Sequence, residues 1–370
     1  MEHFITGIQI CELRHLSDIT ILLDQENRQH LMITGKNGSG KTSLLIALKK
    51  YLTAIEIGEP LTEFDTQIQA TFNKKAYLGS LYGDGKFIIA FFPADRKIRI
   101  LRANGVEDIK LRTAYDIEDN PSALLHKYMV HLKTQQAYAR NEGNATDVDR
   151  IQKWFDRFVG ALRILLEDDS LTLEYDYKTY DFKIHEDGRK PYGLDVLSDG
   201  YSSVLHIVSD LMLRMDQDWL FKEGISEYNV EGVALIDELE THLHIELQKK
   251  IMPFLTAFFP RIQFIVTTHS PYILNSISNA KAYDLENCIE LESLSLYSAD
   301  GLAEGYFGAD EYADELKEKL NQYKELTGII NPTEEERARR AKLRMELKNI
   351  PKGLSTEARD QFEEIEGMRL

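Results

Sequence analysis

Residues 35–42 read GKNGSGKT and match the pattern G-x-x-x-x-G-K-[ST] in full. Glycines in such a loop let the backbone curl so that its N–H groups point inward and bind phosphate oxygens. Lys41 is placed to reach the β- and γ-phosphates of a nucleotide, and the hydroxyl of Thr42 is placed to ligate Mg²⁺. The candidate phosphate-binding residues are Gly35, Asn37, Gly38, Ser39, Gly40, Lys41, Thr42 and Ser43.

The segments on either side of this loop decide how specific the motif is. An apolar run at residues 31–33 predicts a strand before the loop, and the run at residues 43–48 predicts a helix after it. Strand, loop and helix in this order would place the phosphates at the positive N-terminal end of the helix. The alternative, a glycine-rich turn that binds no nucleotide, is disfavoured by these flanks.

Two carboxylates stand at the end of a second apolar run. Residues 233–238 read VALIDE, and the four apolar residues predict a fully buried strand. Ligands bind at the carboxyl ends of strands in open α/β sheets. Asp237 is therefore placed to hold Mg²⁺, directly or through water, and Glu238 to orient or polarise an attacking water. The alternative is that both are acids at the start of a helix, where Asp and Glu are favoured.

A histidine ends a third apolar run. Residues 262–270 read IQFIVTTHS, and His269 could hydrogen-bond a γ-phosphate or the attacking water. A lone histidine after a strand is more often structural, but this strand follows the acidic one by one helix-length interval. The two strands are therefore predicted to be parallel neighbours. His242 and His244 alone offer too few ligands for zinc, which takes three or four.

The composition limits the classes of protein to consider. The chain has 370 residues, which suits two or three domains or one elaborated α/β domain. We expect no membrane span, because no run of about 18 uncharged apolar residues occurs, and no signal peptide at the N-terminus. Cys11 and Cys288 are the only cysteines, which argues against a disulfide framework and favours the reducing cytoplasm. The net charge of −17 argues against non-specific DNA binding by the whole surface.

The pattern of apolar residues predicts a chain that begins with strands and ends with charged helices. The region 121–167 reads as helical, with a break at residues 141–144. A stripe of Leu316, Leu320, Tyr323 and Leu326 predicts a helix that covers a partner or the chain's own core. A turn is predicted at residues 83–85, and residues 171–175 and 180–184 are predicted to form a hairpin. Strands are predicted at residues 4–10, 19–23, 31–33, 68–72, 87–92, 171–175, 180–184, 288–291 and 294–297.

Four motifs in a fixed order reveal a family resemblance. The phosphate loop is followed by LSDGY at residues 197–201, LIDE at 235–238 and TTHS at 267–270. Together they resemble the ABC-type ATPases, and among these the RecF/SMC/OLD group. Residues 92–96, FPADR, are similar to a strand-end element of bacterial stand-alone ATPases of this type.

The resemblance implies an α/β fold: an ABC-type P-loop ATPase with a mixed sheet, a helical insert, an antiparallel lobe and a C-terminal helical extension. It covers residues 4–110 and 190–275. The implied division is 1–110 for the N-terminal lobe with the phosphate loop, 111–190 for the helical insert and hairpin, 191–300 for the lobe with the later motifs, and 301–370 for the C-terminal extension.

Residue roles follow from the resemblance, motif by motif. Lys41 and Thr42 would bind the phosphates and the Mg²⁺ of ATP. Asp237 would be the Walker B acid, Glu238 the catalytic glutamate and His269 the switch histidine.

The signature motif implies that a complete site needs more than one chain. Ser198 and Gly200 would contact the γ-phosphate of the ATP held by a second protomer, so that ATP would join two subunits of a dimer or higher oligomer. Asp199 and Tyr201 stand where many ABC-type proteins have glycine and glutamine, which would weaken ATP-driven closure. No glutamine stands out as the Q-loop residue, so that assignment stays open.

The resemblance points further to bacterial anti-phage defence. The PtuA-like ATPases of Septu and retron systems pair with an HNH nuclease, and the AriA-like ATPases, the near alternative, pair with a TOPRIM nuclease. We expect a separately encoded effector nuclease, because the residues after Leu274 leave no room for a TOPRIM domain and show no long heptad arm. A RecF-like DNA-repair ATPase or DNA clamp is a second hypothesis, which the acidic charge disfavours. An ABC transporter ATPase is a third, which the signature and the C-terminal extension disfavour.

A basic run near the C-terminus stands out in this acidic chain. As a solvated helix face it would form i,i+4 pairs with Glu334, Glu335 and Glu336. As a functional surface it would dock a nucleic acid or an acidic partner. The run consists of Arg337, Arg339, Arg340, Lys342, Arg344, Lys348 and Lys352.

Overall fold

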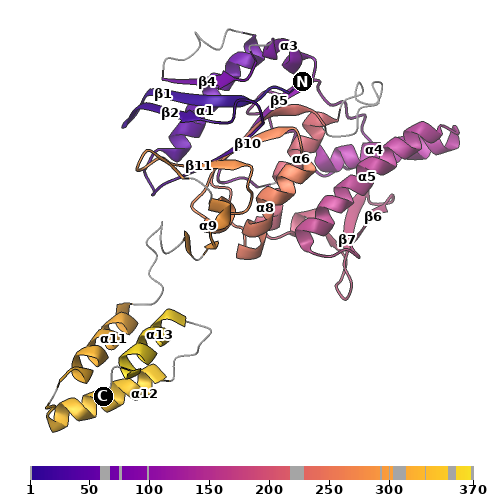
Figure 1. The fold of residues 1–370 in the computed structure, drawn as a ribbon. Coiled ribbons are helices and arrows are strands. Elements are labelled where there is room, and N and C mark those ends of the chain that lie inside the picture. The colour runs from indigo at the N-terminus through magenta and orange to yellow at the C-terminus, as the bar shows by residue number, and fades with distance from the viewer. Residues whose placement is uncertain are drawn as a thin grey trace. The chain divides into compact units, whose positions relative to one another are not determined.

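Contacts between residues divide the chain into two units, Met1–Leu296 and Tyr297–Leu370, which we describe separately. The first unit carries every motif of the sequence, and the described elements of the second are helices (Figure 1). None of the described helices is both long enough and apolar enough to cross a membrane. The computed structural model describes residues 2–58, 67–74, 77–97, 100–216, 229–291, 294–299, 301–302, 314–329, 331–348 and 356–367.

A six-stranded mixed sheet forms the centre of the first unit (Figure 1). Its order is β12-β11-β3-β10-β9-β5, in which β12 is antiparallel to β11 and the other neighbours are parallel. All residues of β3, β9 and β10 are buried, as expected for parallel strands covered on both faces. The strands are β3 His30–Thr34, β5 Phe87–Phe92, β9 Glu231–Ile236, β10 Ile262–Thr267, β11 Ala280–Asp284 and β12 Ile289–Leu291.

The sheet confirms the predicted pairing of the two motif-bearing strands. β9 and β10 are parallel neighbours, with Val266 opposite Ile236. Their carboxyl ends, which lead to Glu238 and His269, therefore lie at the same edge of the sheet. β3, which leads into the phosphate loop, is the other neighbour of β10.

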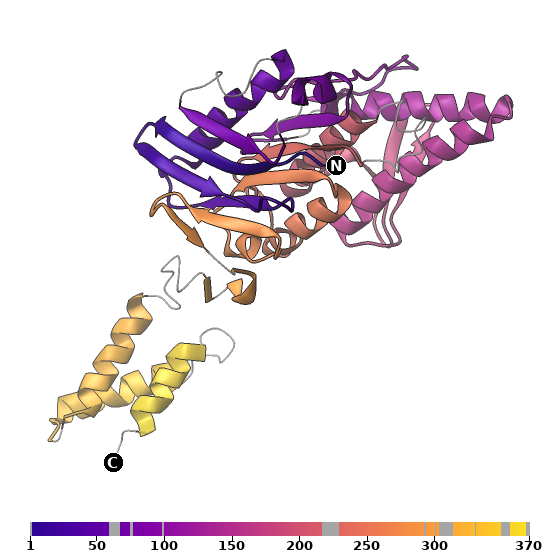
Figure 2. The ribbon, with the colours of Figure 1, turned by 45° about the horizontal axis from the view of Figure 1, so that its top comes forward.

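A second, antiparallel sheet covers the helix that follows the phosphate loop. Its order is β2-β1-β4, and Figure 2 shows β1 and β2 in indigo. Helix α1 contacts β4 as well as β9 and β10, and its buried residues share one apolar cluster with both sheets. The helix that would carry the phosphates at its N-terminus is thus fixed from two sides. The bounds are α1 Lys41–Ile57, β1 Ile5–Leu13, β2 Leu16–Leu22 and β4 Ile68–Phe72.

The turn predicted at residues 83–85 does not join two strands of one sheet. β4 and β5 belong to different sheets, and helix α3 Leu78–Gly83 lies between them in the chain. Leu78 and Tyr82, one helical turn apart, are buried, and α3 contacts α1. The prediction is correct only for the end of this segment, where Gly85, with φ +68°, turns the chain toward β5.

The predicted helical insert consists of two helices, and the predicted break separates them. Asn144 caps the second helix by accepting a hydrogen bond from the N–H of Asp147. Phe155 of α5 stacks on Phe182 of β7, which joins the helices to a small antiparallel sheet. The predicted hairpin is confirmed, since β6 pairs with β7. The elements are α4 Leu125–Asn141, α5 Ala145–Leu166, β6 Thr172–Asp176, β7 Asp181–His185 and β8 Tyr192–Gly193.

Helices also connect the strands that carry the later motifs. α6 Asp199–Met215 begins directly after Ser198 and is buried along most of its length. α8 Ile245–Phe258 supplies the crossover that the parallel strands β9 and β10 require. Short helices complete the unit: η1 Pro121–Leu124, η2 Leu194–Val196, α9 Pro271–Leu274 and η3 Leu294–Leu296.

The two strands predicted after residue 287 have different outcomes. The first is confirmed as β12, which extends the central sheet. The second, at residues 294–297, is wrong, because residues Leu294–Leu296 form one turn of 3-10 helix. Leu296 is 81% exposed, so the short apolar pattern there meets no sheet face.

Three described helices form the second unit, and its core contains the predicted stripe. Leu320 and Tyr323 of α11 are buried, while Leu316 and Leu326 pack at the edge of the cluster. Of the two alternatives for the stripe, the chain's own core is therefore the one observed. The helices are α11 Asp314–Thr327, α12 Glu334–Lys348 and α13 Thr356–Gly367, and α12 and α13 contribute Leu343, Leu347, Phe362 and Ile365 to the cluster.

The basic run lies on α12, and part of it serves the packing of this unit. Arg344 donates a hydrogen bond to Glu366 of α13 at 2.8 Å. Glu336 accepts hydrogen bonds from the N–H and the hydroxyl of Thr333, which caps the start of α12. Lys352 lies outside the described residues.

Candidate functional site

The phosphate loop connects the end of β3 to the first residue of α1. Gly35, Gly38 and Gly40 have φ values of +125°, +88° and +100°, which only glycine adopts without strain. A Cβ atom on Gly35 would lie 3.2 Å from the carboxylate of Asp284, and one on Gly40 would lie 3.0 Å from Leu16. The loop therefore needs its glycines both for conformation and for space, and the predicted strand, loop and helix are confirmed.

Lys41 is buried beneath the loop that would hold the phosphates. Its ammonium donates to the carbonyl of Gly35 at 2.7 Å and to that of Lys36 at 3.0 Å. Burial lowers the pKa of Lys41, while the negative charges of Glu238 and Glu240 oppose this shift. An ammonium has three protons to donate. Two are used by the loop, which leaves the third for a phosphate oxygen.

Thr42 and Asp237 meet although they come from different elements. The Thr42 hydroxyl donates to Oδ1 of Asp237 at 3.2 Å, and the Thr267 hydroxyl donates to the same oxygen at 2.6 Å. The Asp237 carboxylate is buried directly after β9. Hydroxyl and carboxylate oxygens are the hard ligands that Mg²⁺ prefers, so this pair fits the ion. The described residues hold no cluster of three His, Cys, Asp or Glu, so water and nucleotide oxygens would complete the coordination.

Glu238 occupies a strained position next to this pair. Its φ of +44° lies in the left-handed region, which is rare for residues other than glycine. Its N–H donates to the Thr267 hydroxyl at 2.7 Å, and its Oε2 accepts a hydrogen bond from Thr241 at 3.2 Å. Strained backbone persists where the surrounding structure fixes it, and such residues cluster at functional sites.

His269 follows β10 and faces the site with an unsatisfied nitrogen. Its backbone N–H donates to Glu240 at 2.5 Å, whereas its Nε2 is buried without a hydrogen-bond partner among the residues that the structure describes. Burial and the positive charge of Lys41 lower the pKa of His269, so the ring is neutral at pH 7. Buried polar atoms are normally satisfied, so unsatisfied ones call for a ligand or water. The same property is recorded for the oxygens Thr34 Oγ1, Ser39 Oγ and Glu240 Oε2 and for one side-chain nitrogen each of Arg28, Arg96, Trp154 and Arg157.

No recorded hydrogen bond among the described residues joins the signature residues to the phosphate loop of the same chain. Ser198 precedes the first residue of α6, and a Cβ on Gly200 would lie 2.5 Å from the carbonyl of His242. Asp199 forms an ion pair with Lys97 at 2.9 Å.

His242 and His244, the pair considered for zinc, are both exposed. They belong to no group of three or more potential metal ligands in the described part of the chain.

Sequence reasoning missed three residues that hold the site together. Thr267 joins Asp237 and Glu238 through one hydroxyl group. It is the residue after Val266, which lies opposite Ile236, so the parallel register could have revealed it. Glu286, after β11, pairs with Lys36 of the loop at 3.0 Å, and no motif marks it. Arg96 donates to the carbonyl of Asp237 at 2.7 Å, and only the FPADR segment pointed to it.

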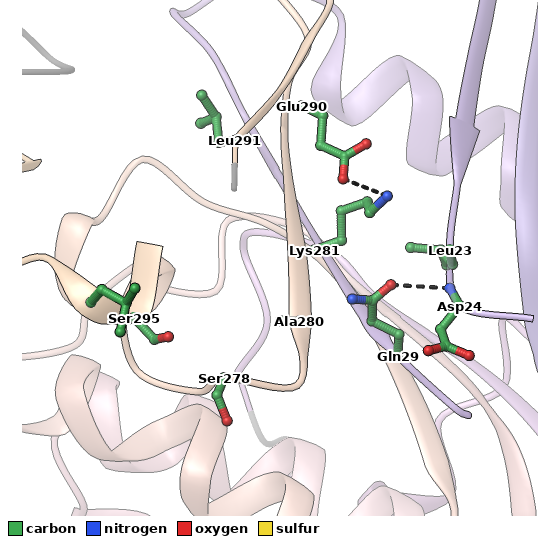
Figure 3. A pocket seen from close by; sticks show the side chains of 10 residues that line it. Leu23, Asp24, Gln29, Ser278, Ala280, Lys281, Glu290, Leu291 and Ser295 are labelled. Carbon is green, nitrogen blue, oxygen red and sulfur yellow. Dashed lines mark hydrogen bonds and ion pairs between the residues drawn. The ribbon is translucent and has the colours of Figure 1, made fainter. Parts of the chain in front are cut away.

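A separate hollow of roughly 600 Å³ lies at the other end of β3 (Figure 3). Its one lysine, Lys281, forms an ion pair with Glu290 at 2.5 Å, and Gln29 accepts a hydrogen bond from the N–H of Asp24 at 3.1 Å. Gln29 precedes β3 whereas the phosphate loop follows it. Since its lysine is already neutralised, this hollow does not suit a polyphosphate.

Together, the glycine loop, the buried Lys41 and the acidic end of β9 beside β10 define a P-loop ATPase of the ABC type with an α/β fold. The family described as "AAA domain, putative AbiEii toxin, Type IV TA system" matches residues 75–275. The chain belongs to this family. The matched segment contains the signature, Asp237, Glu238 and His269, and begins after the phosphate loop.

Curated relatives carry defence-system names. The chain is 27% identical over 392 residues to Septu protein PtuA of Bacillus mycoides (strain KBAB4), covering 96% of this chain and 51% of that protein. It is 36% identical over 91 residues to the Retron Ec83 probable ATPase of Escherichia coli, covering 25% of this chain and 16% of the relative. It is 33% identical over 98 residues to Septu protein PtuA of Bacillus thuringiensis, covering 26% and 24%. The chain thus spans about half the length of the first relative and aligns with less of the others.

Solved structures with a related arrangement include the SMC head domain from Thermotoga maritima. It has a TM-score of 0.39 and 13% identity, and the alignment covers 78% of this chain and 97% of that one. The SmcHead bound to the C-winged helix domain of ScpA has a TM-score of 0.41 and 11% identity, with 78% and 96% covered.

Proposed function

We propose that the chain binds ATP with Mg²⁺ and hydrolyses it to ADP and phosphate in the cytoplasm of a bacterium, where it acts in anti-phage defence. The observation that carries this proposal is the meeting of Thr42 with Asp237 at 3.2 Å, next to Glu238 and behind the glycine loop. A phosphate-bound Mg²⁺ needs these oxygen ligands, and an attacking water needs a carboxylate beside them.

The residues divide the work of hydrolysis. The N–H groups of the loop and the Lys41 ammonium bind the β- and γ-phosphates, and Thr42 and Asp237 hold the ion. An Mg²⁺ held by Thr42 and Asp237 would supply positive charge to neutralise the charge that develops on the phosphate oxygens. Glu238 orients the attacking water and accepts its proton, so that the water oxygen bonds to the γ-phosphorus as the bond to ADP breaks. The unsatisfied Nε2 of His269 hydrogen-bonds the γ-phosphate or this water.

We further propose that two chains share each ATP. The signature residue Ser198 stands at the start of α6 and is not hydrogen-bonded to its own phosphate loop among the described residues. A helix N-terminus attracts anions, and α6 offers its N-terminus together with the Ser198 hydroxyl. In a dimer, Ser198 and Gly200 of one chain would contact the γ-phosphate on the loop of the other.

A mixing experiment tests this shared site. Lys41→Ala weakens phosphate binding, and Ser198→Ala removes the contact across the interface, so each variant alone should have little activity. A mixed dimer contains one site with both residues intact and one site with neither. Half of randomly formed dimers are mixed, so about a quarter of the activity of the unchanged protein should return on mixing. Phosphate release measured before and after mixing checks this result.

The control for this experiment is a mixture of Lys41→Ala with Lys41→Ala/Ser198→Ala, in which no arrangement restores a site. Recovery in the control, or none in the test mixture, would contradict the shared site. If the test mixture shows no recovery, ATP hydrolysis by monomers of the unchanged protein would show that one chain forms a complete site.

The target of the ATPase is proposed to be a separately encoded effector nuclease. This proposal rests on the resemblance to PtuA-like ATPases and on the names of the relatives. The chain spans only part of the length of these relatives, so their partners are not assigned to it directly. An HNH nuclease is the favoured effector, and a TOPRIM nuclease, as for AriA-like ATPases, is the alternative. The separate three-helix unit is the candidate for holding the effector or a further copy of the chain.

Removing this unit should separate ATP binding from assembly. A chain that ends at Leu296 keeps every site residue from Gly35 to Glu286, so ATP affinity should be unchanged. The oligomer mass should fall, or co-purification with the effector should be lost. Light scattering and pull-down with the product of the neighbouring gene measure both.

A point variant of the full chain supports the truncation. Tyr323→Ala empties the centre of the three-helix cluster, where Tyr323 is fully buried, and should cost that unit about 3–5 kcal/mol. It should reproduce the loss of assembly. Met345→Ala, at a position that is 71% exposed on α12, is the matched control and should have no effect. Unchanged mass and partner binding in the truncated chain would show that the unit is not an assembly platform.

A further inference from the structure

Arg96 lies next to the acidic end of β9, and the hydrogen bonds recorded for its side chain all go to backbone carbonyls. Its side chain is 3% exposed. The guanidinium donates to the carbonyl of Asp237 at 2.7 Å, to that of Glu238 at 3.2 Å and to that of Leu239 at 2.8 Å. A fourth bond, to the carbonyl of Pro93 at 3.2 Å, ties the arginine to the segment that follows β5. One side chain therefore holds three successive carbonyls.

These carbonyls lie beyond the last residue of β9 that pairs with a neighbouring strand. β9 pairs with β5 and β10 as far as Ile236, and neither ladder continues to Glu238. Beyond this point, the N–H groups of Glu238 and Leu239 donate to Thr267, to its hydroxyl at 2.7 Å and its carbonyl at 3.0 Å. β10 thus binds the amide side of the turn and Arg96 binds the carbonyl side. The strained φ of +44° at Glu238 is fixed between them.

An arginine suits this task because of its shape and its permanent charge. Its five N–H donors lie in one plane with fixed directions, whereas a lysine ammonium is a single point. Burial lowers the pKa of Arg96 to about 10, against the opposing charges of Glu240, Asp237 and Glu238, so the group stays protonated at pH 7.

We propose that Arg96 is a positioning residue for ATP hydrolysis: it holds the backbone of residues 237–239 so that Asp237 faces Thr42 and the Glu238 carboxylate faces the γ-phosphate. This inference rests on the proposed function. Arg96 touches neither the phosphate loop nor the ammonium of Lys41 in the recorded hydrogen bonds, so it acts through the two acids and not through phosphate binding.

Arg96→Lys tests the proposal, because it keeps the positive charge and removes the planar guanidinium with its five N–H donors. The affinity for ATP should stay within about twofold of that of the unchanged protein, whereas kcat should fall roughly 10–100-fold, the scale expected for a misplaced catalytic group. Hydrogen exchange at the amides of Glu238 and Leu239 should become faster. A merely structural arginine would lower the melting temperature without separating kcat from affinity.

Arg261→Lys is the matched control. Arg261 donates to the carbonyl of Asn229 at 2.9 Å and pairs with Glu231, at the opposite end of the same strand β9. This variant should leave kcat and exchange at Glu238 unchanged. If Arg96→Lys does not fold, Arg96→Gln, whose planar amide still donates to one carbonyl, serves for the same comparison.

The outcomes separate this inference from the proposed function. Absence of ATP hydrolysis by the unchanged protein would contradict the proposed function. Hydrogen exchange at the amides of Glu238 and Leu239 would still show whether Arg96 holds this backbone. Hydrolysis by the unchanged protein, with equal kcat in Arg96→Lys, would overturn the positioning role alone. Unchanged amide exchange in the folded Arg96 variants would overturn it in either case.

Discussion

Glu238→Gln is expected to bind ATP as the unchanged chain does and to hydrolyse it roughly 10²–10⁴-fold more slowly, the contribution of a positioned general base. The amide keeps the shape of the side chain and can still accept the hydrogen bond from Thr241. It cannot take the proton of the attacking water. Phosphate release under single-turnover conditions measures the loss, and light scattering should show that the ATP-bound oligomer persists longer.

The control for this substitution is Glu246→Gln, eight residues further along the chain. Glu246 is exposed in the first turn of α8 and pairs with Lys249, so its replacement should not alter turnover. If Glu238→Gln released phosphate at the normal rate, another group would be the base, and Glu240, which contacts His269, would be the next to test.

Lys41→Ala is expected to weaken ATP binding roughly 10–100-fold, because a hydrogen bond to a charged group is worth about 1.5–3 kcal/mol. Isothermal calorimetry measures the affinity. The loop carbonyls of Gly35 and Lys36 lose their donor, so a small change in melting temperature is expected as well.

Lys36→Ala distinguishes position from charge in this experiment. It removes the same charge from the same loop, but the Lys36 side chain is 83% exposed and pairs with Glu286. Surface ion pairs contribute little, so ATP affinity should stay within about threefold of the normal value. Equal losses in both variants would mean that only the overall charge of the loop matters, and normal binding by Lys41→Ala would contradict the nucleotide site.

The parts of the site that could be predicted are those with a local cause. The glycines at 35, 38 and 40 mark a curled backbone by themselves, and an apolar strand ending in Asp237 and Glu238 places acids at the edge of a sheet. The interval between the strands was enough to predict that β9 and β10 are parallel neighbours. In each case, the information lies within one segment or in the distance between two.

The parts that escaped prediction depend on contacts between distant segments. Arg96 reaches the carbonyl of Asp237 across 141 residues of sequence, and no periodicity records such a bond. The apolar stripe on α11 was visible, but its partners on α12 and α13 could not be chosen from spacing alone. The run at residues 294–297 fails for a related reason, because a strand requires a neighbour and the pattern does not show whether one exists.

The position of β3 between β10 and β11 sets the moment at which a newly made chain acquires its site. The N–H of Phe264 bonds to the ring of His30, 234 residues earlier, and Ala280 pairs with His30 later still. At a synthesis rate of roughly 5–20 residues per second, about ten to fifty seconds separate these segments on the ribosome. During that time the chain exposes a complete GKNGSGKT segment that has no neighbouring strands. We therefore expect ATP to bind only to chains whose translation has passed β10, because Asp237, Thr267 and His269 all follow the GKNGSGKT segment.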